Sequence, residues 1–154
     1  LISNNICFNI KDSFQDLKQT NTESQSKSIH KFFNNYIKDN EFKGKIIVGS
    51  PDPHGAFKAR CRDGHYAVDL SFFLGNISEI PNNFSVALDV DVNLEKEENN
   101  LIIVGGPVTN LVMNKIIEFL PIQFQQHNQW GIKTLKNEYT DDNIGFIAKI
   151  PHPF

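Results

Sequence analysis

Apolar and polar positions along the chain follow two different periods, which together predict strands and helices. Unbroken apolar runs predict strands buried on both faces, strict alternation predicts half-buried strands, and apolar residues three or four positions apart predict helices. The segments concerned are 45–49 and 101–104 as buried strands, 57–62 and 84–93 as half-buried strands, and 28–38, 65–74 and 108–120 as helices. This order favours an α/β fold: a mixed, mainly parallel sheet flanked by helices, Rossmann-like in arrangement.

Domain organisation follows from a change in composition near Gly44. Residues 1–44 are rich in Asn, Gln, Ser and Lys and contain no Pro, so we expect an amino-terminal helical or linker segment there and the α/β domain over 45–154. The linker 94–99 is too short for an ordinary crossover helix. The strand at 101–104 is therefore either antiparallel to the strand before it or reached by a cramped helical turn. Shorter elements complete the prediction: a first helix near Phe14 and Leu17 with a polar loop over 18–27, strands at 121–124, 132–135 and 144–150, a turn over 136–142, and a helix C-cap at Gly75.

The stretch Asn100–Asn110 (NLIIVGGPVTN) is the strongest local signal, because it predicts a strand, a glycine turn and a helix in succession. Gly105 and Gly106 permit backbone angles and close approaches that a Cβ would block, and Pro107 suits the first turn of a helix. Such a turn lies at the carboxyl edge of the strands, where free N–H groups of the helix attract anions. Neither a complete dinucleotide fingerprint nor a P-loop is present. We therefore take Gly105, Gly106 and Asn110 as candidate ligand-binding residues.

Bulk properties narrow the classes of function. The net charge of −3 and the pI near 5.9 argue against a domain devoted to nucleic-acid backbone contacts. Cys7 and Cys61 lack the spacing of a metal motif, so we expect free thiols. No apolar run approaches the roughly 18 residues of a membrane span. No signal peptide is visible. Because Met113 is the only Met, we expect this sequence to be a piece of a longer protein, and for this piece a cytoplasmic location is favoured.

The segment FKARCR over 57–62 places three cations on one face of its predicted strand. Lys58, Arg60 and Arg62 would suit the phosphate or carboxylate of a ligand, and His54 lies in the preceding loop. The alternative is a solvated strand face whose cations pair with nearby acidic residues. We take Arg60, Arg62 and His54 as candidate side-chain contacts to a ligand.

Acidic residues beside histidines leave other chemistry open. Asp52-x-His54 and Asp63-x-His65 allow a general base oriented by a carboxylate, although no zinc-binding helix motif accompanies them. Asp89 and Asp91, on one face of a predicted strand, could bind Mg²⁺ or Ca²⁺, but such pairs more often lie on the solvent-exposed face of a half-buried strand. We therefore assign no metal, cofactor or catalytic residue.

Several motifs together resemble the carboxyl-terminal module of the archaeal surface-layer-like family. The residues that carry the resemblance are NLIIVGGPVTN at 100–110, Leu120-Pro121, YTDDNIG at 139–145 and IPHPF at 150–154, and more loosely the Pro-His-Gly and Arg-Asp-Gly-His-Tyr segments upstream. The resemblance implies a module found at the end of surface-layer proteins and also in intracellular proteins of unassigned role. If the parent is a true surface-layer protein, the resemblance implies a location at the cell surface. It carries over Gly105, Gly106, Pro107 and Asn110, and with them Asp142 and Gly145, and it implies no catalytic residue.

Three functions follow as hypotheses. The leading one is a non-catalytic module that binds an anionic small molecule or a protein partner at the glycine turn 105–110. The second is an enzyme acting on a phosphorylated or nucleotide substrate, with His54 or His65 as base. The third is a structural assembly module of a surface layer, which predicts homo-oligomers.

Overall fold

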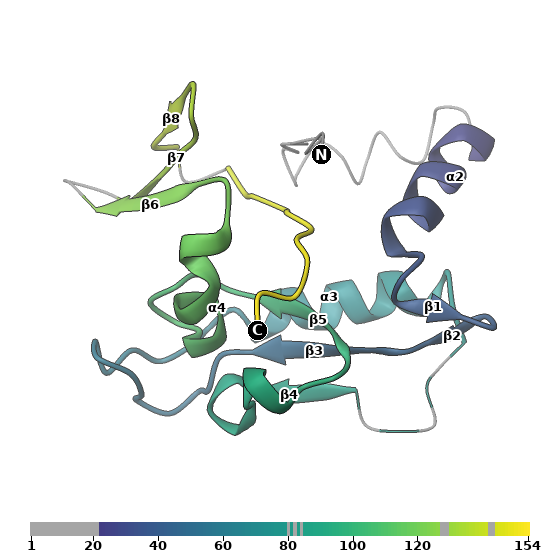
Figure 1. Cartoon of the computed structure of the whole chain (residues 1–154), viewed down its shortest axis with the longest axis horizontal. Helices are drawn as coiled ribbons and strands as arrows, with labels where there is room; N and C mark the ends of the chain where they lie inside the picture. The colour runs from purple at the N-terminus through teal and green to yellow at the C-terminus, as the bar shows by residue number, and fades with distance from the viewer. Residues whose placement is uncertain (1–21, 80, 82, 84, 127–129, 142–143) are drawn as a thin grey trace. The chain divides into compact units, whose positions relative to one another are not determined.

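The computed structural model describes residues 22–79, 81, 83, 85–126, 130–141 and 144–154 (Figure 1). The helix expected near Phe14 and Leu17, together with Cys7 and Asp142, lies outside these residues. The chain divides into two compact units, which we describe one at a time. The first consists mainly of Ser24–Ile116, and the described part of the second lies mainly within Ile117–Pro153.

A three-stranded parallel sheet forms the centre of the first unit. The middle strand β3 (Gly44–Val48) pairs on one side with β4 (Val86–Leu88) and on the other with β5 (Asn100–Val104). A central strand needs apolar residues on both faces, which the runs KIIV and LIIV supply. The α/β class and both buried strands are therefore confirmed, and β5 proves parallel to β3. The Rossmann-like arrangement stays a prediction.

The connection from β4 to β5 consists of two short 3-10 turns, η1 (Asp89–Asp91) and η2 (Leu94–Lys96). Of the two alternatives left open by the sequence, the structure thus contains the cramped helical turn. The strand expected over 84–93 ends at Leu88, so that expectation was wrong over its second half. The physical reason is that the Asp89 side chain accepts backbone hydrogen bonds from other segments, which turns the chain out of the sheet.

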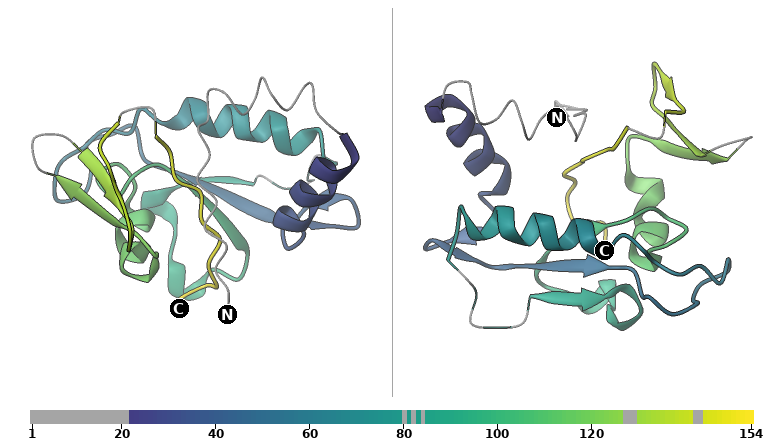
Figure 2. Two further views of the ribbon diagram at one scale, coloured as in Figure 1. Left: turned by 90° about the horizontal axis from the view of Figure 1, so that it is seen from above. Right: turned by 180° about the vertical axis from the view of Figure 1, so that it is seen from behind.

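Successive residues of β3 point to opposite faces of the sheet and so belong to two separate hydrophobic cores. Helix α3 (Gly64–Gly75) covers one face, and α4 (Leu111–Ile116) with η2 covers the other (Figure 2). The first core contains Phe42, Ile46, Ala67 and Leu74, and the second contains Ile47, Leu94, Val112 and Ile116. The sheet is therefore the middle layer of the first unit.

The helices confirm the expected elements but differ at their ends. Helix α3 matches the expected 65–74, yet Gly75 is its last residue and not a left-handed cap, because Asn76 closes it with φ −81°. Residues 107–109 form a turn, so α4 starts three residues later than expected. It continues into the 3-10 helix η3 (Ile117–Phe119).

Residues before Gly44 pack into the first core. Helix α2 (Thr22–Phe33) is followed by the antiparallel pair β1 (Ile37–Lys38) and β2 (Glu41–Phe42). The helix expected over 28–38 therefore starts and ends too late, and the loop expected over 18–27 is helical from Thr22. The helix ends at Phe33, and residues 37–38 pair with β2 instead of continuing it, because Asp39 and Asn40, with φ of 52° and 66°, form the left-handed turn of the β1–β2 hairpin. The Tyr36 ring stacks on Phe42 at 6.5 Å between centroids.

The second unit contains an antiparallel three-stranded sheet. Its strands are β6 (Gln123–Gln126), β7 (Trp130–Lys133) and β8 (Glu138–Tyr139), paired in that order. Strands β6 and β7 lie two residues away from the expected 121–124 and 132–135, in opposite directions. The turn expected over 136–142 contains β8, and the strand expected over 144–150 is wrong because that segment has no regular structure. The Thr134 hydroxyl accepts the Asn137 backbone N–H, which closes the β7–β8 turn.

Candidate functional site

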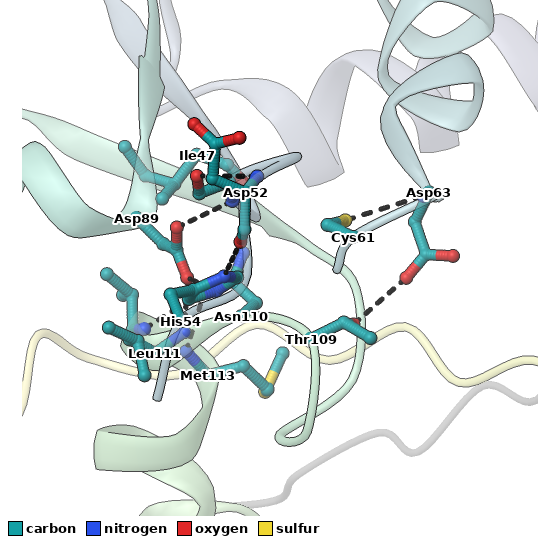
Figure 3. Close-up of polar contacts among 12 residues, drawn as sticks. Ile47, Asp52, His54, Cys61, Asp63, Asp89, Thr109, Asn110, Leu111 and Met113 are labelled. Atoms are coloured by element: carbon teal, nitrogen blue, oxygen red, sulfur yellow. Dashed lines mark hydrogen bonds and ion pairs between the residues drawn. The ribbon is translucent and has the colours of Figure 1, made fainter. Parts of the chain in front are cut away.

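Two loops meet at the carboxyl edge of the parallel sheet (Figure 3). One follows β3 over residues 49–63, and the other is the glycine turn 105–110, which follows β5. They touch at Gly49, where an added Cβ would lie only 2.0 Å from the Thr109 carbonyl oxygen. The Thr109 hydroxyl also donates to the Asp63 carboxylate at 3.1 Å. The loop after β3 and the glycine turn are therefore in contact at this edge of the sheet.

Asp89 lies between these loops and bonds to both sides of the site. Asp89 is only 3% exposed. One of its carboxylate oxygens, Oδ1, accepts the Ser50 backbone N–H at 2.8 Å. The other oxygen, Oδ2, accepts the Leu111 backbone N–H at 2.6 Å and faces His54 Nε2 at 2.9 Å. One carboxylate thus fixes the loop after β3, η1 and the start of α4 relative to each other.

The burial of Asp89 corrects the expectation that Asp89 and Asp91 lie on one face of a strand and could bind a metal ion together. Asp89 is buried in a 3-10 turn while Asp91 is exposed, so the two do not share a strand face. Among the described residues, no group of three His, Cys, Asp or Glu side chains is arranged to hold a metal ion. Sequence reasoning missed the role of Asp89, because the alternation over 84–93 places Asp89 with Asp91 on the polar face of the expected strand.

Both ring nitrogens of His54 face oxygen acceptors. Its Nδ1 lies 2.7 Å from the carbonyl oxygen of Asp52, and its Nε2 faces the Asp89 carboxylate. Neither a carbonyl oxygen nor an ionised carboxylate can donate, so both contacts are hydrogen bonds when the two ring nitrogens carry protons. The bond to the Asp52 carbonyl and the negative charge of Asp89 raise the pKa of His54, and they outweigh burial, which lowers it. His54 and Asp89 therefore form an ion pair, with the histidine side chain 9% exposed.

The raised pKa of His54 predicts how stability depends on pH. Since its folded-state pKa exceeds the unfolded value near 6.5, the pair contributes its full stability below about pH 6.5, and the contribution is lost as pH rises through the folded pKa. We expect the difference in unfolding free energy between the parent chain and His54→Asn, measured by urea denaturation, to shrink across this range. The exposed His65, replaced by Asn, is the matched control and should leave the pH dependence unchanged. A difference for His54→Asn that stays constant with pH would contradict the ion pair.

Asn110 is fully buried and caps α4. Its side-chain oxygen accepts the backbone N–H groups of Val112 and Met113 at 3.0 and 3.1 Å. Its amide donates to the carbonyl oxygen of Val104 at 3.0 Å, at the end of β5. Because Asp89 accepts the Leu111 N–H, the first three N–H groups of α4 all have partners within the chain. The anion at this helix start is thus the chain's own Asp89.

The two glycines of the turn differ in their surroundings. Gly105 has φ 116°, a conformation that favours glycine, and a Cβ there would lie 3.3 Å from an Asp63 carboxylate oxygen. Gly106 faces open space, with no atom within 4 Å of the position of a Cβ. The glycine turn is therefore open to a ligand only along its backbone at Gly106.

Residues 55–62, which we call the basic loop, do not form the strand expected at 57–62. Gly55 and Lys58 have φ of 67° and 49°, which breaks the extended conformation, and His54 pairs with Ala59 in an isolated β-bridge. Phe57 is 66% exposed and does not lie on a buried face. The Lys58, Arg60 and Arg62 side chains are exposed and form no hydrogen bond or ion pair with any described residue. Within the part of the chain that is described, no ion pair joins these cations to Asp63, Asp69 or a Glu residue, as the alternative required.

The two Asp-x-His pairs do not form oriented bases. Asp52 contacts His54 through its backbone carbonyl, while the Asp63 carboxylate bonds to Thr109. His65 is exposed, and its Nδ1 lies 2.9 Å from the Arg62 carbonyl oxygen. Cys61 is half-buried, and its Sγ accepts the Asp63 N–H at 3.4 Å. In neither pair does the aspartate carboxylate contact its histidine ring.

Comparison with known proteins places this architecture in a family. No helix among the described residues has the length and apolar character needed to cross a membrane. The chain matched none of the curated proteins with which it was compared. Residues 65–145, more than half of the chain, match the family described as "S-layer like family, outer domain". This stretch includes α3, Asp89, the glycine turn and α4. The chain therefore belongs to the S-layer like family.

Proposed function

We propose that this chain is a non-catalytic, surface-layer-related module that binds a partner carrying anionic groups through its basic loop. Membership of the S-layer like family supports the non-catalytic role. The single observation that carries the binding role is that Lys58, Arg60 and Arg62 are exposed together, without partners among the described residues, on one loop.

The basic loop is held at both ends, which favours binding. The backbone N–H of His54 donates to the Ala59 carbonyl oxygen at 3.1 Å, and the backbone N–H of Cys61 donates to the Ser50 carbonyl oxygen at 3.0 Å. The His54–Asp89 ion pair fixes the start of the loop to η1 and α4. A loop already held in one conformation loses less entropy on binding than a free one. His54 thus supports the site from inside, as a positioning residue, instead of contacting the ligand.

The chemistry of the loop suits carboxylate or phosphate groups. Guanidinium groups such as those of Arg60 and Arg62 bind both kinds of anion with two parallel hydrogen bonds. The exposed ring of Phe57 adds an apolar contact of the kind enriched at protein interfaces. The backbone at Gly106 completes the proposed surface, whereas Gly105 shapes the turn and the Asn110 side chain supports it from within.

Charge reversal tests the proposal. We expect Arg60→Glu with Arg62→Glu to weaken binding of polyglutamate by at least tenfold, about 1.4 kcal/mol, in a fluorescence anisotropy titration, with inorganic phosphate as competitor. The matched control is Lys31→Glu with Lys38→Glu, which makes the same change of charge at exposed positions outside the loop. The unfolding free energy of both variants should stay within about 0.5 kcal/mol of the parent. Equal loss in the control, or unchanged binding in the loop variant, would overturn the proposal.

A further inference from the structure

We infer that protonation of His54 controls the basic loop: the loop is held for binding when the imidazole carries two protons, and it is released when the imidazole carries one. This inference rests on the proposed function and concerns the regulation of the same loop. It depends on three features of the first unit: the acceptors around the ring, the charged groups near it, and the position of His54 at the base of the loop.

A neutral histidine cannot satisfy both acceptors that face the ring of His54. Its Nδ1 lies 2.7 Å from the Asp52 carbonyl oxygen, and its Nε2 lies 2.9 Å from Asp89 Oδ2 (Figure 3). A neutral imidazole has one N–H, so its other nitrogen presents a lone pair to an oxygen that can only accept. Whichever nitrogen keeps its proton, release of the other proton to water therefore turns one hydrogen bond into a repulsive contact.

The groups that face the ring from each neighbouring segment favour the doubly protonated form. They are the Asp52 carbonyl oxygen on the loop itself, the Asp89 carboxylate on η1 and the Thr109 backbone on the glycine turn. Together they raise the pKa of His54 and outweigh burial, which lowers it. Charged side chains on these segments and on α4 that do not contribute to this pKa include Lys58, Arg60, Arg62, Asp63, Asp91 and Lys115. The second proton of His54 is therefore held by the same contacts that hold the loop.

His54 lies at the base of the basic loop, so a change at its ring acts on the loop. Its backbone N–H donates to the Ala59 carbonyl oxygen at 3.1 Å and closes the turn of the loop. Asp89 keeps the N–H groups of Ser50 and Leu111 in either protonation state of the histidine, and so it stays in place. The repulsion therefore moves the ring and the loop attached to it. A loop that is held only part of the time binds more weakly, in proportion to that fraction.

A binding titration at several pH values tests the inference. In fluorescence anisotropy, we expect the Kd of the whole chain for polyglutamate to rise by about threefold or more from about pH 6 to about pH 9, because the held fraction of the loop falls. Lysine, arginine and glutamate side chains titrate outside this range in model peptides. His54→Gln, whose amide is a neutral donor at every pH, should bind with a Kd that does not change over this range. The matched control His65→Asn removes an exposed histidine and should keep the pH dependence of the parent.

Hydrogen exchange of the chain without any anion shows whether the loop itself opens. The backbone N–H groups of His54 and Cys61, which hold the loop at both ends, should lose protection by a similar factor over the same pH range, after correction for intrinsic exchange. They should also exchange faster than the N–H of Ile46 in β3, because the loop opens while the sheet stays folded. In His54→Gln, the protection of these loop groups should not change with pH.

The outcomes separate this inference from the proposed function. A Kd that does not change with pH, with binding still lost on charge reversal of Arg60 and Arg62, overturns the control by His54 and leaves the proposed function standing. A Kd that rises with pH while the loop keeps its protection also overturns the inference, because the charge of the ring then attracts the anion directly. The same pH dependence in His54→Gln as in the parent assigns the effect to another group and overturns it as well. Absence of polyglutamate binding at every pH refutes the proposed function and this inference together.

Discussion

Replacing Asp89 by Ala is expected to lower the free energy of unfolding by about 3–5 kcal/mol, the cost of removing one partner from a buried ion pair. The change leaves the His54 imidazolium without its counter-ion and removes the acceptor for the N–H groups of Ser50 and Leu111. Each buried donor left without an acceptor costs a further amount of free energy. Urea denaturation followed by circular dichroism at pH 6, where His54 is charged, measures the effect.

Asp91 provides the matched control, because it is the same residue type two positions further along and is exposed. Asp91→Ala should change the unfolding free energy by no more than about 0.5 kcal/mol. A double-mutant cycle of Asp89→Ala with His54→Ala should give a coupling of about 0.5–3 kcal/mol. If Asp89→Ala costs no more than Asp91→Ala, the carboxylate does not hold the three segments together.

The parts of the fold that the sequence predicted well are those with a strong one-dimensional pattern. Strands β3 and β5 carry unbroken apolar runs, and α3 has a buried stripe at helical spacing, so their burial follows from the local sequence alone. The predicted strand at 57–62 had six alternating residues, but Gly55 and Lys58 adopt left-handed angles that periodicity does not reveal. A short alternating pattern is therefore weak evidence for a strand when turn-forming residues lie beside it.

The sequence indicated that the glycine turn lies at the carboxyl edge of the sheet, but not which groups form hydrogen bonds with one another there. Parallel strands bring their carboxyl ends to one edge, so the meeting of the two loops follows from topology. The partners that decide which groups are free are distant in sequence: His54 and Asp89 are 35 residues apart, and Asp89 and Leu111 are 22 apart. A carboxylate at a polar position of an alternating segment is predicted to face solvent. The sequence does not reveal that N–H groups from distant segments form hydrogen bonds with it and make its burial possible. That is why a helix start expected to bind an external anion holds an internal one.

Replacing Gly49 by Ala is expected to lower the unfolding free energy by more than about 3 kcal/mol, at the upper end of overpacking effects. The added Cβ would lie 2.0 Å from the Thr109 carbonyl oxygen and 2.7 Å from Cys61 Cβ. A backbone oxygen cannot rotate away as a flexible side chain can, so the two loops must separate. Thermal unfolding followed by circular dichroism measures the loss.

Gly106→Ala is the control for this change, since nothing lies within 4 Å of its Cβ position and its φ is not positive. It should shift stability by less than about 1 kcal/mol. Because the close approach at Gly49 holds the glycine turn against the loop that carries His54, Gly49→Ala should also weaken the pH dependence that the His54–Asp89 pair produces. A Gly49→Ala chain that unfolds like Gly106→Ala and keeps the parent's pH dependence would mean that the loops do not meet at this edge. Loss of both properties together would show that a single close backbone contact positions the ion pair and the basic loop that it supports.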